Sequence, residues 1–239
     1  MENSNKKNGI FLGVISVATL IVAIIGATFA YFSAQTQSDS NAVNVKAYEF
    51  GAELTSFKRI YPDELNDSER ATKALTEGII PVLSTNLEKA INNTNKCIDE
   101  NGHMVCALYE AEITNTGKAL DLGVSIKSIE NKKGPKGSNF TDLRFQGLTS
   151  SAENTYGIGP TEKVNISTEK DGVVSAGTLH IDEGTTEAPA TVKHYFAIYL
   201  EEPEGGNTDQ SSQMGATFVG QIFYASGEGT DKLTGTFTV

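Results

Sequence analysis

Tryptophan is absent from the 239 residues of this sequence, which also contain only three histidines and two cysteines. A carbohydrate-binding module normally presents exposed tryptophan to its sugar, so this absence argues against a sugar-binding platform. The histidines lie far apart, and no HExxH, GxSxG, P-loop or GxGxxG motif is present. The sequence therefore offers no nucleophile, metal-ligand set or cofactor motif, and we predict that the protein is not an enzyme.

Three short acidic stretches are the nearest approach to a metal site. Residues 99–101, 182–183 and 201–202 carry the oxygen ligands that Ca²⁺ needs, provided that folding brings them together. No loop has the D-x-[DN]-x-[DN]-G spacing of a calcium site, so the sequence favours a solvated acidic surface with no bound metal.

Basic residues are scarce as well, because 19 lysines and arginines stand against 30 aspartates and glutamates, a net charge of −11 at pH 7. An acidic surface repels phosphate and lacks the attraction that supplies most non-specific affinity for nucleic acid. We therefore expect no nucleic-acid partner. A large negative charge is an ordinary way to remain soluble outside a cell.

The sequence has one long hydrophobic run, residues 9–32, and none of its 24 residues is charged. Lys6 and Lys7 precede it and small residues crowd its end, which is the pattern of an export signal. The run is also long enough to span a bilayer, because about 20 apolar residues cover the hydrocarbon core. Its length alone leaves two alternatives, a cleaved signal peptide and a retained transmembrane helix.

The end of the run favours cleavage. Signal peptidases prefer small side chains at the −3 and −1 positions, and Thr28 and Ala30 provide them. A cut after Ala34 is a poorer alternative, because it would place Phe32 at −3. We predict cleavage after Ala30, which makes Tyr31 the new N-terminus. The chain then consists of a signal peptide (1–30), an N-terminal arm (31–41) and a β-sandwich domain (42–239).

Residues on both sides of the predicted cut follow a distinctive order. A glycine is followed by Thr, an aromatic residue and Ala, then by a second aromatic residue, a polar stretch and an alternating strand. These are Gly26, Thr28-Phe29-Ala30, Phe32, residues 35–41, and Val43, Val45 and Ala47. Over residues 9–54 this order resembles the TasA/camelysin family of secreted bacterial matrix-fibre proteins, whose signal peptides are removed by a dedicated SipW-type peptidase.

The resemblance implies a secreted, jelly-roll-like protein of the extracellular matrix or cell surface that contacts the membrane only before cleavage. It implies head-to-tail self-assembly into biofilm-matrix fibres, with a SipW-type signal peptidase and an accessory anchor protein as partners. In such a fibre the freed arm completes a sheet of the next subunit, which gains a row of backbone hydrogen bonds. The expected donor residues are Tyr31, Phe32, Ser33, Ala34, Gln35, Thr36, Gln37 and Ser38.

A monomeric binding module is the alternative function. It would be a secreted or membrane-tethered, adhesin-like sandwich that recognises a surface polymer or protein through the loops at residues 131–139 and 203–213. The alternative to a donor strand is that the arm folds back on its own sheet.

The remainder of the sequence alternates apolar and polar residues in short segments separated by turn residues, which is typical of an all-β fold. The clearest hairpin is expected between residues 105–114 and 119–129. Helical patterns occur at residues 62–75 and within residues 79–96, where Ser84 or Thr85 with Glu88 would form a cap. About nine strands with a short helical insertion favour an antiparallel, jelly-roll-like β-sandwich. Further strands are expected within residues 42–60, 140–150, 162–168, 172–181, 191–202, 216–226 and 232–239.

The aromatic residues of segment 191–202 are expected to belong to the core. Alternation places Tyr195 and Tyr199 on one face of the strand and Phe196 and Ile198 on the other, so at least one face is buried.

The two cysteines, Cys97 and Cys106, flank Asn101-Gly102, the strongest short signal for a two-residue type I′ hairpin. That turn would place Cys97 directly opposite Cys106. The Cα atoms of such a non-hydrogen-bonded pair are about 4.5 Å apart, which a disulfide accepts. In an exported protein we expect the bond to form, with two reduced thiols as the alternative.

Ala30→Leu should block removal of the signal peptide, because a bulky side chain does not fit the −1 position. We expect an uncut, membrane-bound precursor, detected by its intact mass in the membrane fraction. Ala34→Leu is the matched control and should be processed at Tyr31. Normal secretion of Ala30→Leu with an unchanged N-terminus would place the cut elsewhere.

Overall fold

The computed structural model describes residues 51–62, 78–94, 96–152, 154–161, 163–204, 209–227 and 232–239, which all belong to the unit Ala42–Val239. The hydrophobic run, the cleavage site, the N-terminal arm and the helix expected after Pro62 lie outside these ranges. None of the helices in the described ranges is long and apolar enough to cross a membrane.

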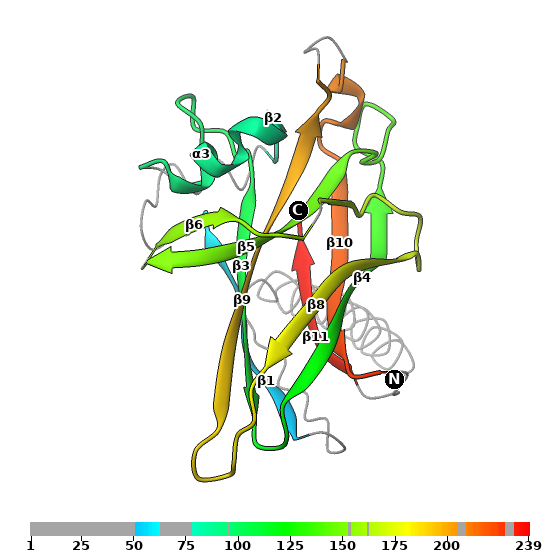
Figure 1. The fold of residues 1–239 in the computed structure, drawn as a ribbon. Helices are drawn as coiled ribbons and strands as arrows, with labels where there is room; N and C mark the ends of the chain where they lie inside the picture. Colours follow the sequence, from blue (N-terminus) through cyan, green and yellow to red (C-terminus); the bar gives the residue numbers. More distant parts are fainter. Residues whose placement is uncertain are drawn as a thin grey trace, which may run out of the picture. The chain divides into compact units, whose positions relative to one another are not determined.

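The regular structure of these ranges is almost entirely β-strand (Figure 1). One short α-helix and two 3₁₀ turns are the exceptions in the described part of the chain. The strands are β1 (Ala52–Tyr61), β2 (Pro81–Leu83), β3 (Ala107–Asn115), β4 (Leu120–Lys132), β5 (Leu143–Ala152), β6 (Thr155–Ile158), β7 (Val164–Asn165), β8 (Val173–Ile181), β9 (Ala190–Glu202), β10 (Thr217–Ala225) and β11 (Lys232–Thr238). The helical elements are η1 (Ser84–Asn86), α3 (Leu87–Asn92) and η2 (Ser211–Gln213).

The strands form two sheets, which confirms the predicted all-β sandwich. The larger sheet has seven strands in the order β1-β3-β9-β5-β6, with β2 paired to β9 and β7 paired to β5. The smaller sheet has four strands in the order β11-β10-β4-β8. All of these pairs are antiparallel except β2 with β9. Strand β10 shows the alternation that predicted it, because Phe218, Gly220, Ile222 and Tyr224 are buried and the residues that alternate with them are only partly so.

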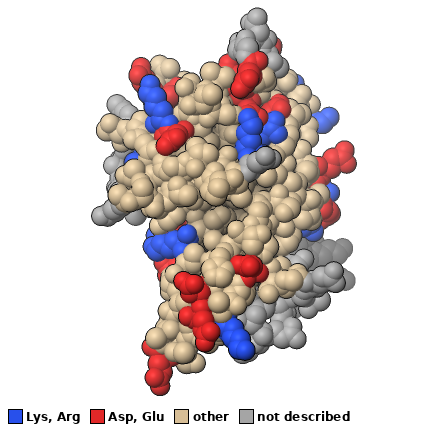
Figure 2. Space-filling view, in the orientation of Figure 1, with Lys and Arg blue, Asp and Glu red and all other residues tan. Residues whose placement is uncertain are grey.

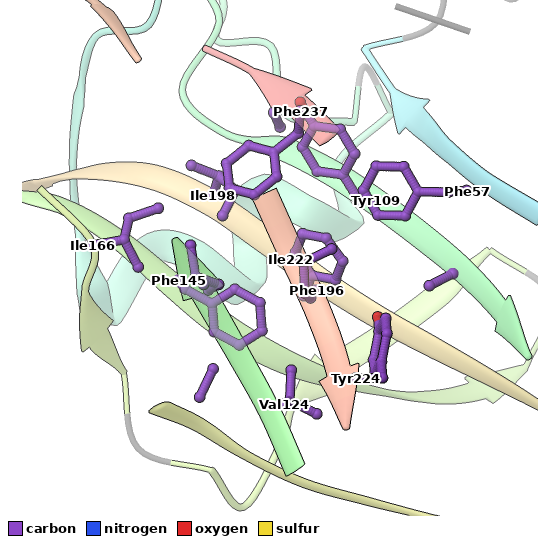
Figure 3. Close-up of a cluster of buried hydrophobic side chains, with 14 of the residues drawn as sticks. Phe57, Tyr109, Val124, Phe145, Ile166, Phe196, Ile198, Ile222, Tyr224 and Phe237 are labelled. Atoms are coloured by element: carbon purple, nitrogen blue, oxygen red, sulfur yellow. The ribbon is translucent and has the colours of Figure 1, made fainter. Parts of the chain in front are cut away.

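Phe196 of β9 lies at the centre of an aromatic cluster between the two sheets (Figure 3). Its ring centroid is 5.3 Å from that of Tyr109 on β3 and 5.0 Å from that of Phe145 on β5. The rings of Phe57 on β1 and Phe237 on β11 are 6.2 and 6.3 Å away. All five side chains are buried, so this cluster joins four strands of the larger sheet to the smaller one.

The outer face of the larger sheet is covered in part by α3 and by the segment that contains the cysteines. Leu87 and Ile91 of α3 belong to a second buried cluster together with Leu108 of β3 and Tyr199 of β9. Tyr199 is 1% exposed and Phe196, on the other face of the same strand, is fully buried. The prediction of core residues is therefore confirmed for Phe196 and Tyr199 on opposite faces of β9, whereas Tyr195 is only partly buried.

The cap expected for α3 is not formed. The helix begins at Leu87 after the 3₁₀ turn at Ser84–Asn86, and its N-cap residue, Asn86, makes no side-chain cap hydrogen bond. The Ser84 hydroxyl instead donates to the Glu201 carboxylate. Because η1 places Ser84 beside β9, its hydroxyl is not available to the helix.

Strands β3 and β4 do not form the hairpin that their sequences predict. β3 pairs with β1 and β9 in the larger sheet, whereas β4 pairs with β10 and β8 in the smaller one. The buried side chain of Asn115 occupies the connection. Its Nδ2 donates to the carbonyls of Gly117, Lys118 and Asp182 at 3.3, 2.8 and 2.9 Å, and its Oδ1 accepts the Gly117 N–H at 3.0 Å. These bonds satisfy backbone groups that a hairpin would otherwise pair, so the chain passes between the sheets.

Cys97 and Cys106 form the predicted disulfide, with Cα atoms 4.8 Å apart. The predicted register of their hairpin is wrong by one residue. Val105 N donates to the Cys97 carbonyl, and Asp99 N donates to the His103 carbonyl, so the loop contains three residues and Cys97 pairs with Val105. The backbone bends at Cys97, where φ is 61°.

Asp99 is the reason for the different turn. Its Oδ1 accepts the N–H groups of Asn101 and His103 at 2.9 and 2.7 Å, which starts the turn at Asp99. A type I′ turn needs positive φ at both central residues, but only Gly102 has it, at 85°. The loop is thus the three-residue kind that ends in a left-handed glycine.

Replacing both cysteines by alanine should lower the free energy of unfolding by about 2–3 kcal/mol, because the closed loop is short. The variant should still fold, since the aromatic cluster around Phe196 does not include either cysteine. Denaturant unfolding followed by circular dichroism measures the change, and the reduced wild type should match the variant. Two free thiols in unreduced secreted protein would contradict the disulfide.

Candidate functional site

On the face shown in Figure 2, charged side chains form small groups and no single sign dominates. Two mixed groups in the structure are built around a mostly buried carboxylate, Glu110 on β3 and Glu201 on β9. Because buried carboxylates with perturbed pKa values are a common mark of functional sites, each group is a candidate site.

Glu110 lies between β1 and β9 on the outer face of the larger sheet. Lys58 of β1 and Lys193 of β9 approach its carboxylate at 3.3 and 3.2 Å. Burial tends to raise the pKa of Glu110, but hydrogen bonds from Tyr195 and Lys193 and the charge of Lys58 outweigh burial and lower it. Lys58 and Tyr195 are the direct cross-strand neighbours of Glu110, so this group stabilises the sheet as a charged cross-strand ladder.

Lys96, next to the disulfide, lies beside two tyrosine rings. Its Nζ is 5.8 Å from the Tyr61 ring centroid and 6.0 Å from that of Tyr156, and it donates to the Asn154 carbonyl at 2.6 Å. Tyr61 donates to Asn154 Oδ1 at 3.0 Å. Burial lowers the pKa of Lys96, and burial followed by nearby charges raises the pKa of Tyr156 to about 12. These contacts fix the turn between β5 and β6 against the disulfide segment.

Glu201 gathers a serine and a lysine in an arrangement similar to a Ser–Lys catalytic pair. Lys163 Nζ is 3.0 Å from Ser84 Oγ, and both contact the Glu201 carboxylate, which also accepts Arg144 Nε at 2.6 Å. The hydrogen bond to Glu201 raises the pKa of Lys163, so its ammonium remains protonated and cannot act as a base for the serine. The group therefore anchors η1 and β7 to β9 and is not a nucleophilic site.

The other candidate metal and catalytic residues are dispersed. The Asp99 carboxylate is bonded to backbone N–H groups, His180 bonds Asp121 at 2.6 Å, and His194 is partly buried beside Tyr224. The described residues include no group of three or more His, Cys, Asp or Glu side chains that could hold a metal ion. The three acidic stretches of the sequence are thus not brought together.

The sheet edges offer a different kind of site. β1 forms one edge of the larger sheet and β6 with β7 the other, and β8 and β11 are the edges of the smaller one. Strand β1 pairs with β3 along its length, with register shifts after Leu54 and Arg59, and has no second partner among the described strands. The β8 edge is irregular at Gly177, where φ is 109° and the pairing with β4 shifts register after Val124. The edge of β1 is therefore the longest surface for strand addition in the described chain.

The two loops named for the alternative function lie together. Ser138 N donates to the Ser212 carbonyl at 3.3 Å, and Thr141 N donates to Gln213 Oε1 at 2.9 Å. A Cβ at Gly134 would lie 2.3 Å from the Met214 carbonyl, so the backbones touch. Residues 131–139 and the described part of 203–213 therefore form one continuous surface. The predicted cleavage residues and the arm lie outside the described ranges.

No protein-family model and no curated protein sequence matches this chain. Among solved structures, a family 123 glycoside hydrolase from Clostridium perfringens aligns with 56% of this chain and 20% of its own, at 12% identity and a TM-score of 0.28. The sporulation control protein Spo0M from Bacillus subtilis aligns with 56% of this chain and 41% of its own, at 6% identity and a TM-score of 0.24. The yeast GGA1 GAE domain aligns over 83% of this chain and 99% of its own, at 6% identity and a TM-score of 0.25.

This chain thus spans a minor part of the first two structures, and similarity at these TM-scores carries no argument about function.

His194 should make the protein less stable in acid. Its Nδ1 lies 2.9 Å from the hydroxyl of fully buried Tyr224, and burial lowers its pKa from 6.5 to about 4. The unfolded chain therefore binds one more proton than the folded chain between these two pKa values. The contribution of His194 to the free energy of unfolding should fall by at most about 3 kcal/mol as the pH decreases from 7 to 4.

His194→Gln retains polar atoms beside Tyr224 but does not titrate, so it should lose this part of the pH dependence in urea unfolding. His180→Gln removes an exposed histidine and is the control that should retain it. A wild-type pH slope in His194→Gln would show that another group is responsible.

Proposed function

We propose that this chain is an exported structural subunit that polymerises head to tail into extracellular matrix fibres. The observation that carries the proposal is the order of its parts, in which a 24-residue uncharged run leads through a polar arm into an all-β domain. The β1 edge, which has no second partner among the described strands, supports it, because a strand from another copy could pair there. The TasA/camelysin-like N-terminus supports the same function.

The proposal includes a specific fold for the sandwich, the jelly roll. Its support is the way the chain passes between sheets, as at Asn115, where β3 of the larger sheet leads to β4 of the smaller one. Such connections between two packed sheets are typical of jelly-roll sandwiches.

The arm at residues 31–38 is the proposed donor strand. Its partner is a second copy of the chain, and a SipW-type signal peptidase releases it by cutting between Ala30 and Tyr31. Burial of Tyr31 and Phe32 would add about 3–6 kcal/mol to the backbone pairing, before the entropic cost of association is subtracted. The mature protein would then be secreted into the matrix or held at the cell surface by an accessory anchor protein.

A monomeric binding module remains the second candidate function. The observation that favours it is the continuous surface that residues 131–139 form with η2. Loops at one end of a sandwich are a common recognition surface. In that case the protein remains monomeric and its arm makes no contact with other copies.

Deleting residues 31–38 from the mature protein distinguishes the two functions. If the arm is the donor strand, the variant keeps its β circular-dichroism spectrum but forms no fibres in electron micrographs, because no strand is available to the next copy. Excess peptide 31–38 should also shorten wild-type fibres by occupying the acceptor edge.

The matched control replaces residues 31–38 with eight Gly and Ser residues, which preserves the length of the arm without its aromatic tip. This variant should also fail to form fibres. Fibres of normal width from the deletion variant would rule out the donor arm.

A further inference from the structure

A small apolar groove lies where β2 meets the end of β9. Its volume is about 210 Å³, and its lining includes Ile79, Pro81, Leu200 and Met214. Met214 is 63% exposed, more than any other large hydrophobic side chain in the described chain. Pockets for whole small-molecule ligands measure about 300–1,000 Å³, so a groove of this size suits a single large side chain.

Two polar groups of the groove lack partners among the described residues. The Glu202 carboxylate makes no ion pair or side-chain hydrogen bond there, in contrast to Glu201, which binds Arg144 and Lys163. Gln210 is 8% exposed, and its Nε2 donates to the Glu201 carbonyl at 2.9 Å, but its Oε1 has no donor. The groove therefore combines an apolar wall, an unpaired negative charge and a buried acceptor.

We propose that this groove binds Tyr31 of a neighbouring copy, once cleavage has made Tyr31 the N-terminal residue. The inference rests on the proposed function and names the contact that holds the arm. The tyrosine ring packs on the apolar wall beside Met214, since methionine sulfur makes favourable contacts with aromatic rings. The new α-ammonium group is the cation that pairs with Glu202, as in other cases of N-terminal amine capture.

The phenolic hydroxyl of Tyr31 provides a third contact, with Gln210. Gln210 lines the groove and its Oε1 has no donor, so a tyrosine hydroxyl can donate to it once the Gln210 side chain turns toward the bound ring. Phe32 has neither a free amine nor a hydroxyl, which is why Tyr31 is the assigned occupant. In the uncut precursor the Tyr31 nitrogen is part of a peptide bond, so cleavage creates the charge that the groove selects.

Peptide binding tests the site directly. The receptor is the secreted mature chain with Tyr31→Ala, whose own arm lacks the aromatic ring and so competes only weakly. The probe is a peptide of residues 31–41 with a free N-terminus and a C-terminal fluorophore. Fluorescence anisotropy should show saturable binding. N-terminal acetylation should weaken it about tenfold, and Tyr31→Phe in the peptide several-fold.

Receptor variants locate the contact. Glu202→Gln should weaken binding of the free peptide about tenfold and remove the difference between free and acetylated peptides. Met214→Asp should abolish binding, whereas Val173→Asp, at a residue that is 55% exposed elsewhere, is the control and should not. An acetylation effect that persists in Glu202→Gln, or full binding to Met214→Asp, would overturn the assignment.

Electron microscopy separates the failure of this site from the failure of the proposed function. Wild-type fibres together with peptide binding that is unaffected by Glu202→Gln and Met214→Asp would mean that the arm docks elsewhere, so this inference alone would be wrong. A wild type that remains monomeric and binds no peptide would contradict both the site and the fibre function.

Discussion

Packing of aromatic rings around Phe196 is the interaction on which the rest of the structure depends. Phe196 lies on β9, the strand that pairs with both β3 and β5, and its ring contacts aromatic residues of β1, β3, β5 and β11. Full burial of a large apolar side chain contributes about 1.5–3 kcal/mol, so this one cluster is a substantial part of the stability of the sandwich. The cluster also sets the geometry of the exterior. The position of β9 fixes three features of the exterior. The Glu110 ladder joins β9 to its neighbour β3, helix α3 packs on both of these strands, and the groove lies where β2 pairs with β9.

The sequence was sufficient to predict the fold class and most strands, because alternation of apolar and polar residues directly reflects which face of a strand is buried. The short strands β2 and β6 were not predicted. It was not sufficient to predict which strands pair. The segments at β3 and β4 have the pattern of a hairpin, and only the buried hydrogen bonds of Asn115, one of them to distant Asp182, send them into different sheets. The hairpin of the two cysteines also shows that the local sequence does not determine how strands pair. Cys97 and Cys106 are bonded, but the carboxylate of Asp99 shifts the turn by one residue, which the Asn-Gly pair does not reveal.

The candidate sites depend even more on long-range contacts. Ser84, Lys163 and Glu201 are far apart in the sequence, so their association and the raised pKa of Lys163 could be found only from the fold. The groove residues Met214 and Glu202 are likewise brought together only by the fold. The sequence did contain one signal, because Met214 is a large apolar residue between the polar segment 207–213 and Gly215. By contrast, the arm and the cleavage site were proposed from local sequence alone, because signal peptidases read a short linear pattern.

Intact mass and size of the protein recovered from the culture medium test the proposed function most directly. If the chain is an exported fibre subunit, its mass corresponds to residues 31–239 and it elutes from a gel-filtration column as large, heterogeneous species that increase with concentration. A chain that retains residues 1–30, or a sharp monomer peak at every concentration, would contradict the proposal that cleavage releases an arm for assembly.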